Sequence, residues 1–121
     1  FISLPGLLLA NGQLDEAANV IAGFLSRRSH GLIPNRITDD GSTPEYNSID
    51  ATLWAFLAAN AWREAGGDRQ RLRDQFFPAF KEILSTLAQG TLFSFQADPA
   101  DGLLSAGTLE TQVTWMDARV Y

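Results

Sequence analysis

Apolar residues recur at helical spacing along much of the chain. Between residues 14 and 25 they fall on one face of a helix with a 3.6-residue period, and Asp15 and Glu16 occupy its first turn, where acids favour the helix dipole. A shorter apolar run predicts another helix over residues 4–9. The expected buried face of the longer helix consists of Leu14, Ala17, Ala18, Ile21, Phe24 and Leu25.

Two further helices are predicted in the middle of the chain. One runs over residues 48–65 and ends at Gly66-Gly67. The next begins with Asp68 as its N-cap and contains Pro78, which predicts a kink or a division into two segments. Their expected apolar stripes are Leu53, Trp54, Leu57, Ala58 and Ala61 in the first, and Leu72, Phe76, Phe80, Ile83, Leu84 and Leu87 in the second.

Two regions lack the helical pattern. Residues 31–47 form a long polar loop, which Leu32, Ile33 and Ile37 are expected to anchor to the core. Near residues 92–106 the sequence predicts a short β-hairpin, with strands at 92–96 and 103–106 and a turn between them. The fold class expected is therefore all-α, with helical hairpins in series and this one β-hairpin.

Composition narrows the class of function. The 121 residues carry a formal net charge of −5 and no large basic cluster, so a nucleic-acid footprint is not expected. No apolar run is long enough to predict a membrane span. With no Cys and a single His, His30, which is expected at a helix end, the chain predicts no metal site and no cofactor. The chain begins without Met inside an apolar run, and we expect it to be a piece of a longer protein.

Candidate chemistry gathers where the long loop meets the helix at residues 48–65. Here the sequence places a phenol, an amide, a carboxylate and an indole in Tyr46, Asn47, Asp50 and Trp54. Asp50 has an ordinary interpretation, because Asn47 as N-cap and Asp50 at the third helical position would resemble a capping box. However, Asp50 also lies four residues before Trp54, so both side chains point to one side of the helix.

A general acid at Asp50 would face an electrostatic cost. The N-terminus of a helix favours an ionised carboxylate, whereas a general acid must carry a proton. Burial beside Trp54 or a second carboxylate nearby would have to outweigh that effect.

A second aromatic and acidic pair follows near the end of the chain. Trp115 and Asp117 share a face if their segment is extended, so an indole could cover a sugar ring while a carboxylate binds its hydroxyls. An isolated Trp is otherwise usually a core residue. Arg36 is either a salt-bridge residue or a further ligand, and Tyr46 and Asn47 either hold the loop or bind hydroxyls.

Five segments in order resemble the C-terminal glucosidase domain of glycogen debranching enzymes, the amylo-α-1,6-glucosidase part. They cover the whole chain and are more specific together than any one alone. The segments are FISLPGLLL at 1–9, GLIPNR at 31–36, PEYNSIDATLW at 44–54, DGLLSAG at 101–107 and TWMDA at 114–118.

The resemblance implies a glucoamylase-like (α/α)6 toroid, of which residues 1–121 would be a partial catalytic domain. It implies inverting hydrolysis of α-1,6-linked glucose stubs on a branched α-glucan such as glycogen or a limit dextrin, in the cytoplasm. Asp50 matches the family's proposed general acid, and Trp115 and Asp117 match residues that hold the terminal glucose. Arg36, Tyr46, Asn47 and Trp54 are weaker matches, and the catalytic base would lie in a later segment.

Two other readings stay open on the sequence alone. The chain could be a helical carbohydrate-binding or interaction module without catalysis, or part of a toroid glucosidase with another substrate, such as trehalose. Helices taken from a larger toroid would keep apolar faces meant for missing neighbours, so we expect the chain to form homo-oligomers.

Overall fold

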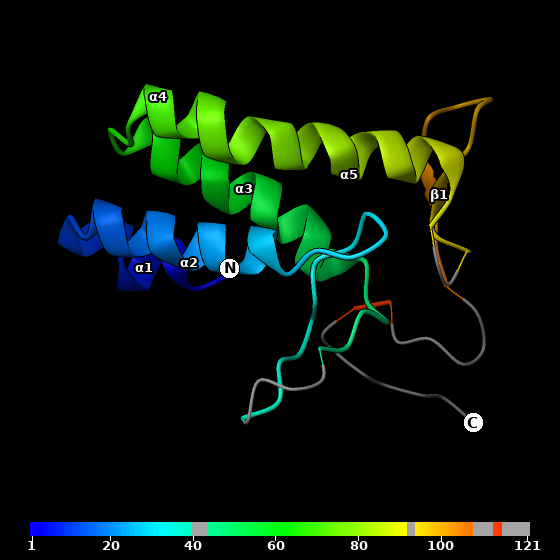
Figure 1. The fold of residues 1–121 in the computed structure, drawn as a ribbon, viewed down its shortest axis with the longest axis horizontal. Helices are drawn as coiled ribbons and strands as arrows, with labels where there is room; N and C mark the ends of the chain where they lie inside the picture. The colour runs from blue at the N-terminus through cyan, green and yellow to red at the C-terminus, as the bar shows by residue number, and fades with distance from the viewer. Residues whose placement is uncertain (40–43, 92–93, 108–112, 115–121) are drawn as a thin grey trace.

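The computed structural model describes residues 1–39, 44–91, 94–107 and 113–114 of the 121-residue chain. Its described part is mostly helical with one small antiparallel sheet, as the sequence predicts (Figure 1). In chain order the elements are α1 (Leu4–Leu7), the 3-10 helix η1 (Leu9–Asn11), α2 (Leu14–Ser26), α3 (Asp50–Glu64), α4 (Arg69–Arg71), the π-helical η2 (Leu72–Phe76), α5 (Phe77–Gln89), β1 (Gln96–Ala97) and β2 (Leu104–Ser105).

Helix α2 lies where the sequence predicts it. Ala17, Ala18, Ile21 and Leu25 are buried, and α2 contacts both α3 and η2. A stop at Gly12, which has φ of 70°, separates α2 from the preceding α1 and η1.

The face that helix α3 buries overlaps the expected one at Ala58 but is turned away from Leu53 and Leu57. Leu53 and Leu57 are exposed, at 40% and 58%, although both belong to the predicted stripe. Trp62, outside that stripe, is 2% exposed and donates its indole N–H to the carbonyl of Leu14 at 2.8 Å. The buried residues of α3 are Thr52, Ala55, Ala58, Ala59 and Trp62, of which Ala58 was predicted.

The segment after α3 divides near Pro78, as predicted. Asp68 caps α4 by accepting a hydrogen bond from the backbone N–H of Gln70 at 2.8 Å. Because Pro78 has no N–H, the turn before it widens into η2, and α5 starts anew with Pro78 in its first turn. In α5 the prediction was wrong for Leu84, which is 58% exposed.

The long loop is anchored as expected by Leu32 and Ile33, both fully buried. It starts with a tight turn in which the backbones of Ser29 and Leu32 bond to each other in both directions. His30 and Gly31 form the turn with φ of 50° and 76°, both left-handed as a type I′ turn requires. His30 therefore belongs to this turn rather than to the end of α2.

The β-hairpin is shorter than predicted. Gln96 pairs with Ser105 and Ala97 with Leu104 in an antiparallel register. The predicted first strand is shifted toward the turn, and its residues 92 and 93 lie outside the described residues.

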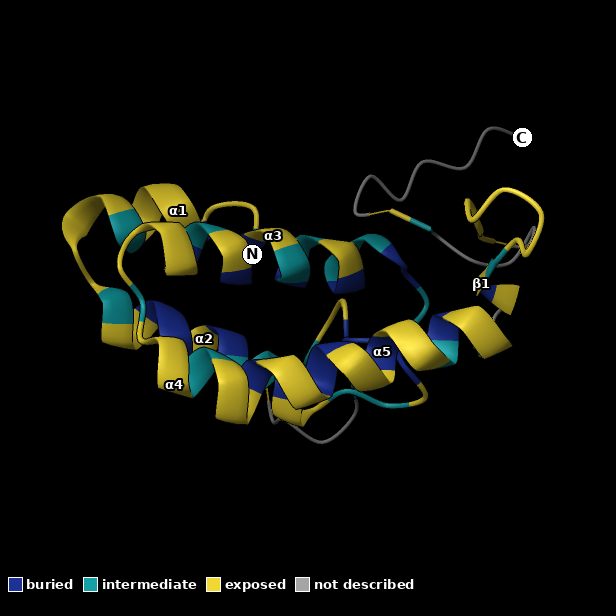
Figure 2. Ribbon diagram, turned by 90° about the horizontal axis from the view of Figure 1, so that it is seen from above, coloured by how far each residue is buried: buried dark blue, intermediate teal, exposed yellow. Residues whose placement is uncertain are grey.

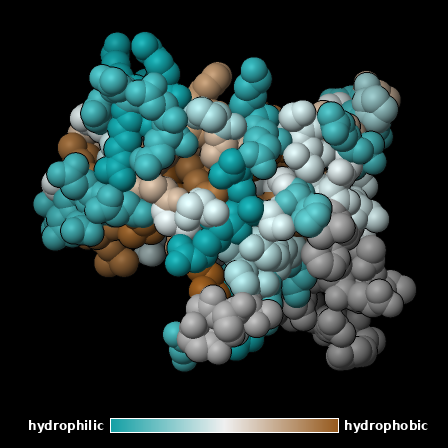
Figure 3. Space-filling model, in the orientation of Figure 1, coloured by the Kyte–Doolittle hydropathy of each residue, from teal (hydrophilic) through white to brown (hydrophobic). Residues whose placement is uncertain are grey.

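The core lies between the helices, whose inward faces carry the buried residues while the outward faces are exposed (Figure 2). Ring contacts join the helices, with Trp62 and Phe76 centroids 5.2 Å apart and Phe56 and Phe80 centroids 4.3 Å apart. Hydrophobic residues also reach the surface, notably at the α1 end of the molecule, where Leu7 is 66% exposed (Figure 3). Among the described helices, none has the length and apolarity needed to cross a bilayer.

Candidate functional site

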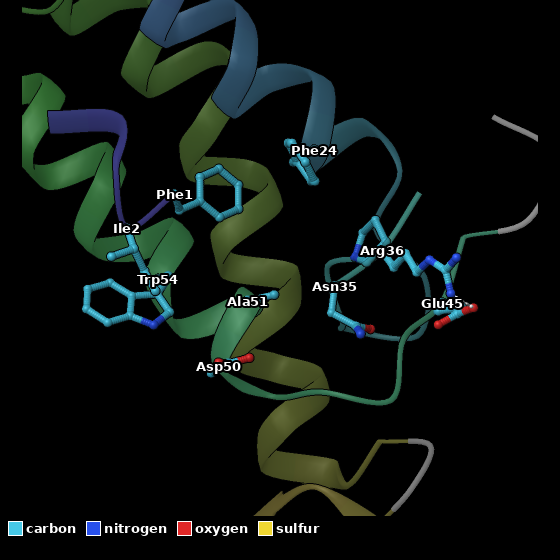
Figure 4. Close-up of a pocket in the computed structure, with 10 residues that line it drawn as sticks. Phe1, Ile2, Phe24, Asn35, Arg36, Glu45, Asp50, Ala51 and Trp54 are labelled. Carbon is cyan, nitrogen blue, oxygen red and sulfur yellow. Dashed lines mark hydrogen bonds and ion pairs between the residues drawn. The ribbon is translucent and has the colours of Figure 1, made fainter. Parts of the chain in front are cut away.

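A cavity of about 480 Å³ opens where three segments meet (Figure 4). The N-terminal residues form one part of its wall, the loop after α2 forms a second, and the first turns of α3 form the third. Its volume lies within the range of about 300–1,000 Å³ that is usual for small-molecule sites. The described lining residues are Phe1, Ile2, Phe24, Pro34, Asn35, Arg36, Glu45, Asp50, Ala51 and Trp54.

Asp50 is the first residue of α3 and is half-buried at the cavity. The hydroxyl of Ser48 donates a hydrogen bond to its Oδ1. The expected capping box is wrong, because Ile49 rather than Asn47 takes the N-cap position and Asp50 stands at the first helical position. The carboxyl group is therefore held by a neighbouring side chain at the edge of a cavity.

Trp54 lies one helical turn after Asp50, and both side chains line the cavity. Their four-residue spacing puts them on the same side of α3, as the sequence predicts (Figure 4). Phe1 and Phe24 add an edge-to-face ring pair, with centroids 5.0 Å apart and an interplanar angle of 60°. The wall thus combines aromatic surface with a carboxyl group.

Arg36 and Glu45 lie across the cavity from Trp54 (Figure 4). Their backbones pair in an isolated antiparallel bridge, and Arg36 Nη1 lies 3.5 Å from Glu45 Oε1. Both side chains are substantially exposed, at 67% and 43%, so this ion pair adds little stability. A backbone hydrogen bond also joins Asn35 to Glu45, since the N–H of Asn35 donates to the carbonyl of Glu45 at 2.9 Å.

A buried hydrogen bond fixes this loop against α3. The backbone N–H of Ile33 donates to Thr52 Oγ1 at 2.9 Å, and both residues are fully buried. Thr52 lies two residues after Asp50, while Pro34 and Arg36 follow Ile33 closely. This bond therefore connects two of the three segments that form the cavity, the loop and the start of α3.

The other predicted residues are placed differently. Tyr46 donates its hydroxyl to the carbonyl of Arg27 at 2.7 Å, so it fastens the loop to the end of α2. Neither Tyr46 nor Asn47 belongs to the described lining of the cavity. Trp115 and Asp117 lie outside the described residues.

The segment just before Trp115 does contact this region. The N–H of Ile49, the residue before Asp50, donates to the carbonyl of Val113 at 3.2 Å. Ile49, just before Asp50, and Val113, just before the segment 114–118, are therefore joined by a backbone hydrogen bond although they lie far apart in the sequence.

The sequence did not identify the aromatic pair of Phe1 and Phe24 as part of a site, because Phe24 also fits the apolar face of α2. Glu45 was visible only as one acid in a polar loop. Together the lining offers ring faces for apolar C–H surface, a carboxyl group for hydroxyls or protons, and an amide and a guanidinium as further donors. This combination suits a neutral polyhydroxylated ligand.

The family model described as amylo-alpha-1,6-glucosidase matches residues 1–121. The glycogen debranching enzyme of Saccharomyces cerevisiae (strain ATCC 204508 / S288c) is 51% identical over 59 residues, which are 49% of this chain and 4% of that enzyme. No solved structure matches the chain.

Proposed function

Because the chain belongs to the amylo-alpha-1,6-glucosidase family, we propose that the protein containing it removes α-1,6-linked glucose stubs from glycogen-like glucans. A glycoside hydrolase role follows from the family itself. The linkage, the inverting mechanism and the roles of individual residues are parts of the proposal. The observation that carries it is the placement of Asp50 and Trp54 together on one cavity.

In this mechanism Asp50 is the general acid. Its carboxyl proton passes to the glycosidic oxygen as the bond between that oxygen and the anomeric carbon breaks. A water molecule attacks the anomeric carbon from the opposite face and gives its proton to a second carboxylate. Inverting enzymes keep the two carboxyl groups about 6.5–9.5 Å apart to leave room for that water.

We propose that the base comes from a part of the protein outside these 121 residues. Within the cavity the other acid among the described residues is Glu45, which pairs with Arg36. Because Glu45 lies beside Arg36 in the loop and is 43% exposed, we do not assign it the role of base.

Substrate binding is assigned to the aromatic and polar residues. Trp54 is proposed to cover a sugar face, and Arg36 is proposed to donate to hydroxyls. Trp115 and Asp117 are proposed to bind the terminal glucose, in line with the family resemblance. Tyr46 and Asn47 belong to the same loop, but the hydroxyl of Tyr46 bonds to Arg27, so we now propose that Tyr46 supports the loop.

The exposed apolar residues fit a chain that is part of a larger helical domain. Leu53, Leu57, Leu84 and Leu104 line a groove of about 520 Å³ between α3, α5 and the β-hairpin. We propose that neighbouring helices of an (α/α)6 toroid cover this groove in the full domain, and that the isolated chain self-associates through it. The cytoplasmic location implied by the resemblance is part of the same proposal.

The test is Asp50→Asn in the full protein that contains this chain, scored by glucose release from a branched limit dextrin. The amide keeps the shape of the side chain but cannot deliver the proton, so we expect kcat to fall by about 10²–10⁴-fold. Asp15→Asn is the matched control, because Asp15 is an exposed acid in the first turn of α2, away from the cavity.

Near-normal turnover of Asp50→Asn would refute Asp50 as the general acid. A separate titration of the same variant with maltooligosaccharides, followed by Trp fluorescence, reports whether the cavity still binds sugar. Retained binding with lost turnover is the outcome expected for a catalytic acid. If the unmodified protein releases no glucose from the dextrin but its fluorescence responds to sugar, the chain belongs to a binding module instead.

A further inference from the structure

Ser48 is buried directly beside Asp50 and has an orientation that suits a supporting role. It is 2% exposed, and its hydroxyl donates to Asp50 Oδ1 at the edge of the cavity. We propose that Ser48 is a positioning residue, which holds the carboxyl group of Asp50 in the orientation from which it transfers a proton. This inference rests on the proposed function, since it assumes that Asp50 is the general acid.

The direction of this hydrogen bond distinguishes it from helix capping. A serine that caps a helix accepts a hydrogen bond from a backbone N–H at the start of that helix. Ser48 instead donates its hydroxyl proton to a side-chain carboxyl oxygen. Its interaction therefore acts on Asp50 rather than on the backbone of α3.

The backbone that follows Ser48 is held by hydrogen bonds to two other segments of the chain. The next residue, Ile49, is 7% exposed, donates its N–H to Val113 at 3.2 Å and accepts a hydrogen bond from Leu53 at 3.2 Å. Thr52, one turn along α3, accepts from Ile33 in the facing loop. The hydroxyl of Ser48 thus projects from a fixed segment, which is what a positioning group needs.

A donor on Oδ1 has a consequence for the placement of the proton on the acid. Because Oδ1 accepts from Ser48, the proton of the neutral carboxyl group belongs on the other oxygen, Oδ2, which selects the oxygen that acts. Arg36 and Glu45 are the other charged side chains among the described lining residues, so the variants below leave both of them unchanged.

The experiment compares Ser48→Ala and Ser48→Thr in the full protein that contains this chain, with two substrates. One is a branched limit dextrin, whose leaving group needs a proton. The other is α-glucosyl fluoride, whose fluoride leaves without protonation and therefore needs little help from a general acid. Ser26→Ala is the control, because the exposed Ser26 hydroxyl donates to the carbonyl of Gly23, away from the cavity.

For Ser48→Ala on the dextrin we expect kcat to fall by about 10- to 100-fold, the cost of a misplaced reacting group, with KM changed by less than about twofold. Turnover of the fluoride should fall much less. Ser48→Thr keeps the hydroxyl and should recover most of the activity, and Ser26→Ala should behave as the unmodified protein.

Equal losses on both substrates would overturn the inference, because a purely structural role predicts that result. Unchanged activity of Ser48→Ala on the dextrin would overturn it as well. Asp50→Asn, assayed in parallel, separates this failure from that of the proposed function. If Asp50→Asn is inactive and Ser48→Ala is normal, only the positioning role fails, whereas a normal Asp50→Asn removes the general acid and the positioning role together.

Discussion

Thr52→Val removes the hydrogen bond that connects the loop to α3 beside the cavity, while nearly keeping the shape of the side chain. Thr52 Oγ1 accepts the backbone N–H of Ile33 at 2.9 Å, and both residues are 0% exposed. In the variant this N–H has no acceptor at that position and is shielded from water. Leaving a buried donor unpaired costs about 1–3 kcal/mol, and the small gain from burying a methyl group offsets part of that. Val and Thr have similar helix propensities, so the helix itself contributes little to the difference.

The net loss that we expect is about 1.5 kcal/mol of unfolding free energy. A chain of this size has a urea m-value of about 1.5 kcal/mol per molar, so the unfolding midpoint should fall by about 1 M. Circular dichroism during urea titration of the 121-residue chain measures this shift. Amide hydrogen exchange by NMR adds a local measurement, because the Ile33 amide should exchange faster than its neighbours.

Thr86→Val is the matched control for this prediction. Thr86 Oγ1 donates to the carbonyl of Glu82 within α5, so its removal leaves no buried N–H without a partner. We expect a change within about 0.5 kcal/mol. Equal midpoint shifts for Thr52→Val and Thr86→Val, or unchanged exchange at Ile33, would refute the reasoning about this bond.

Two further predictions concern other parts of the chain. Gly31→Ala places a Cβ 2.5 Å from the Cβ of Thr86 at a φ of 76°, so thermal denaturation should show a loss of more than about 1 kcal/mol in unfolding free energy. Gly12→Ala is the control, because Gly12 is also left-handed but has open space around it. Equal losses in the two variants would contradict the role of the clash with Thr86. Leu57→Glu puts a charge on a residue that is 58% exposed in the apolar groove, so the assembly formed by the isolated chain should have a lower mass by light scattering. Leu7→Glu at the α1 end is the control and should leave that mass unchanged. An unsubstituted chain that is already monomeric would contradict this prediction.

The difference between the predicted and observed faces of α3 shows where sequence reasoning reaches its limit. This helix is apolar on more than one side, with Leu53 and Leu57 on one and Ala55, Ala59 and Trp62 on another. Periodicity shows that a face exists, but two candidate faces on one helix compete for the same neighbour. The face with the small residues packs on α2, because small side chains let the two helices approach closely. Trp62 fills the remaining space, and its indole N–H donates to the carbonyl of Leu14.

The sequence predicted some residues of the candidate site and missed others, for a related reason. The spacing of Asp50 and Trp54 along one helix requires only local geometry, and both line the cavity as expected. The contribution of Phe1 and Phe24 depends on how the N-terminal segment packs on α2, which no local pattern encodes. The capping role expected for Asn47 was wrong because Ile49, bonded to Val113, takes the N-cap position instead.

The sequence by itself determined the elements that rest on short-range chemistry. Asp68 as a cap, Pro78 as the point of division in the last long helix, Gly12 as a stop and the polar loop after α2 all follow from backbone preferences of single residues. The ordered motifs likewise pointed to the family that the whole chain matches. Only the tertiary structure decided which face each helix buries and which side chains share the cavity, because packing compares surfaces from distant segments. The contact of Ser48 with Asp50 belongs to this second group, since the side-chain directions at the start of α3 depend on the loop and on Val113 that hold it.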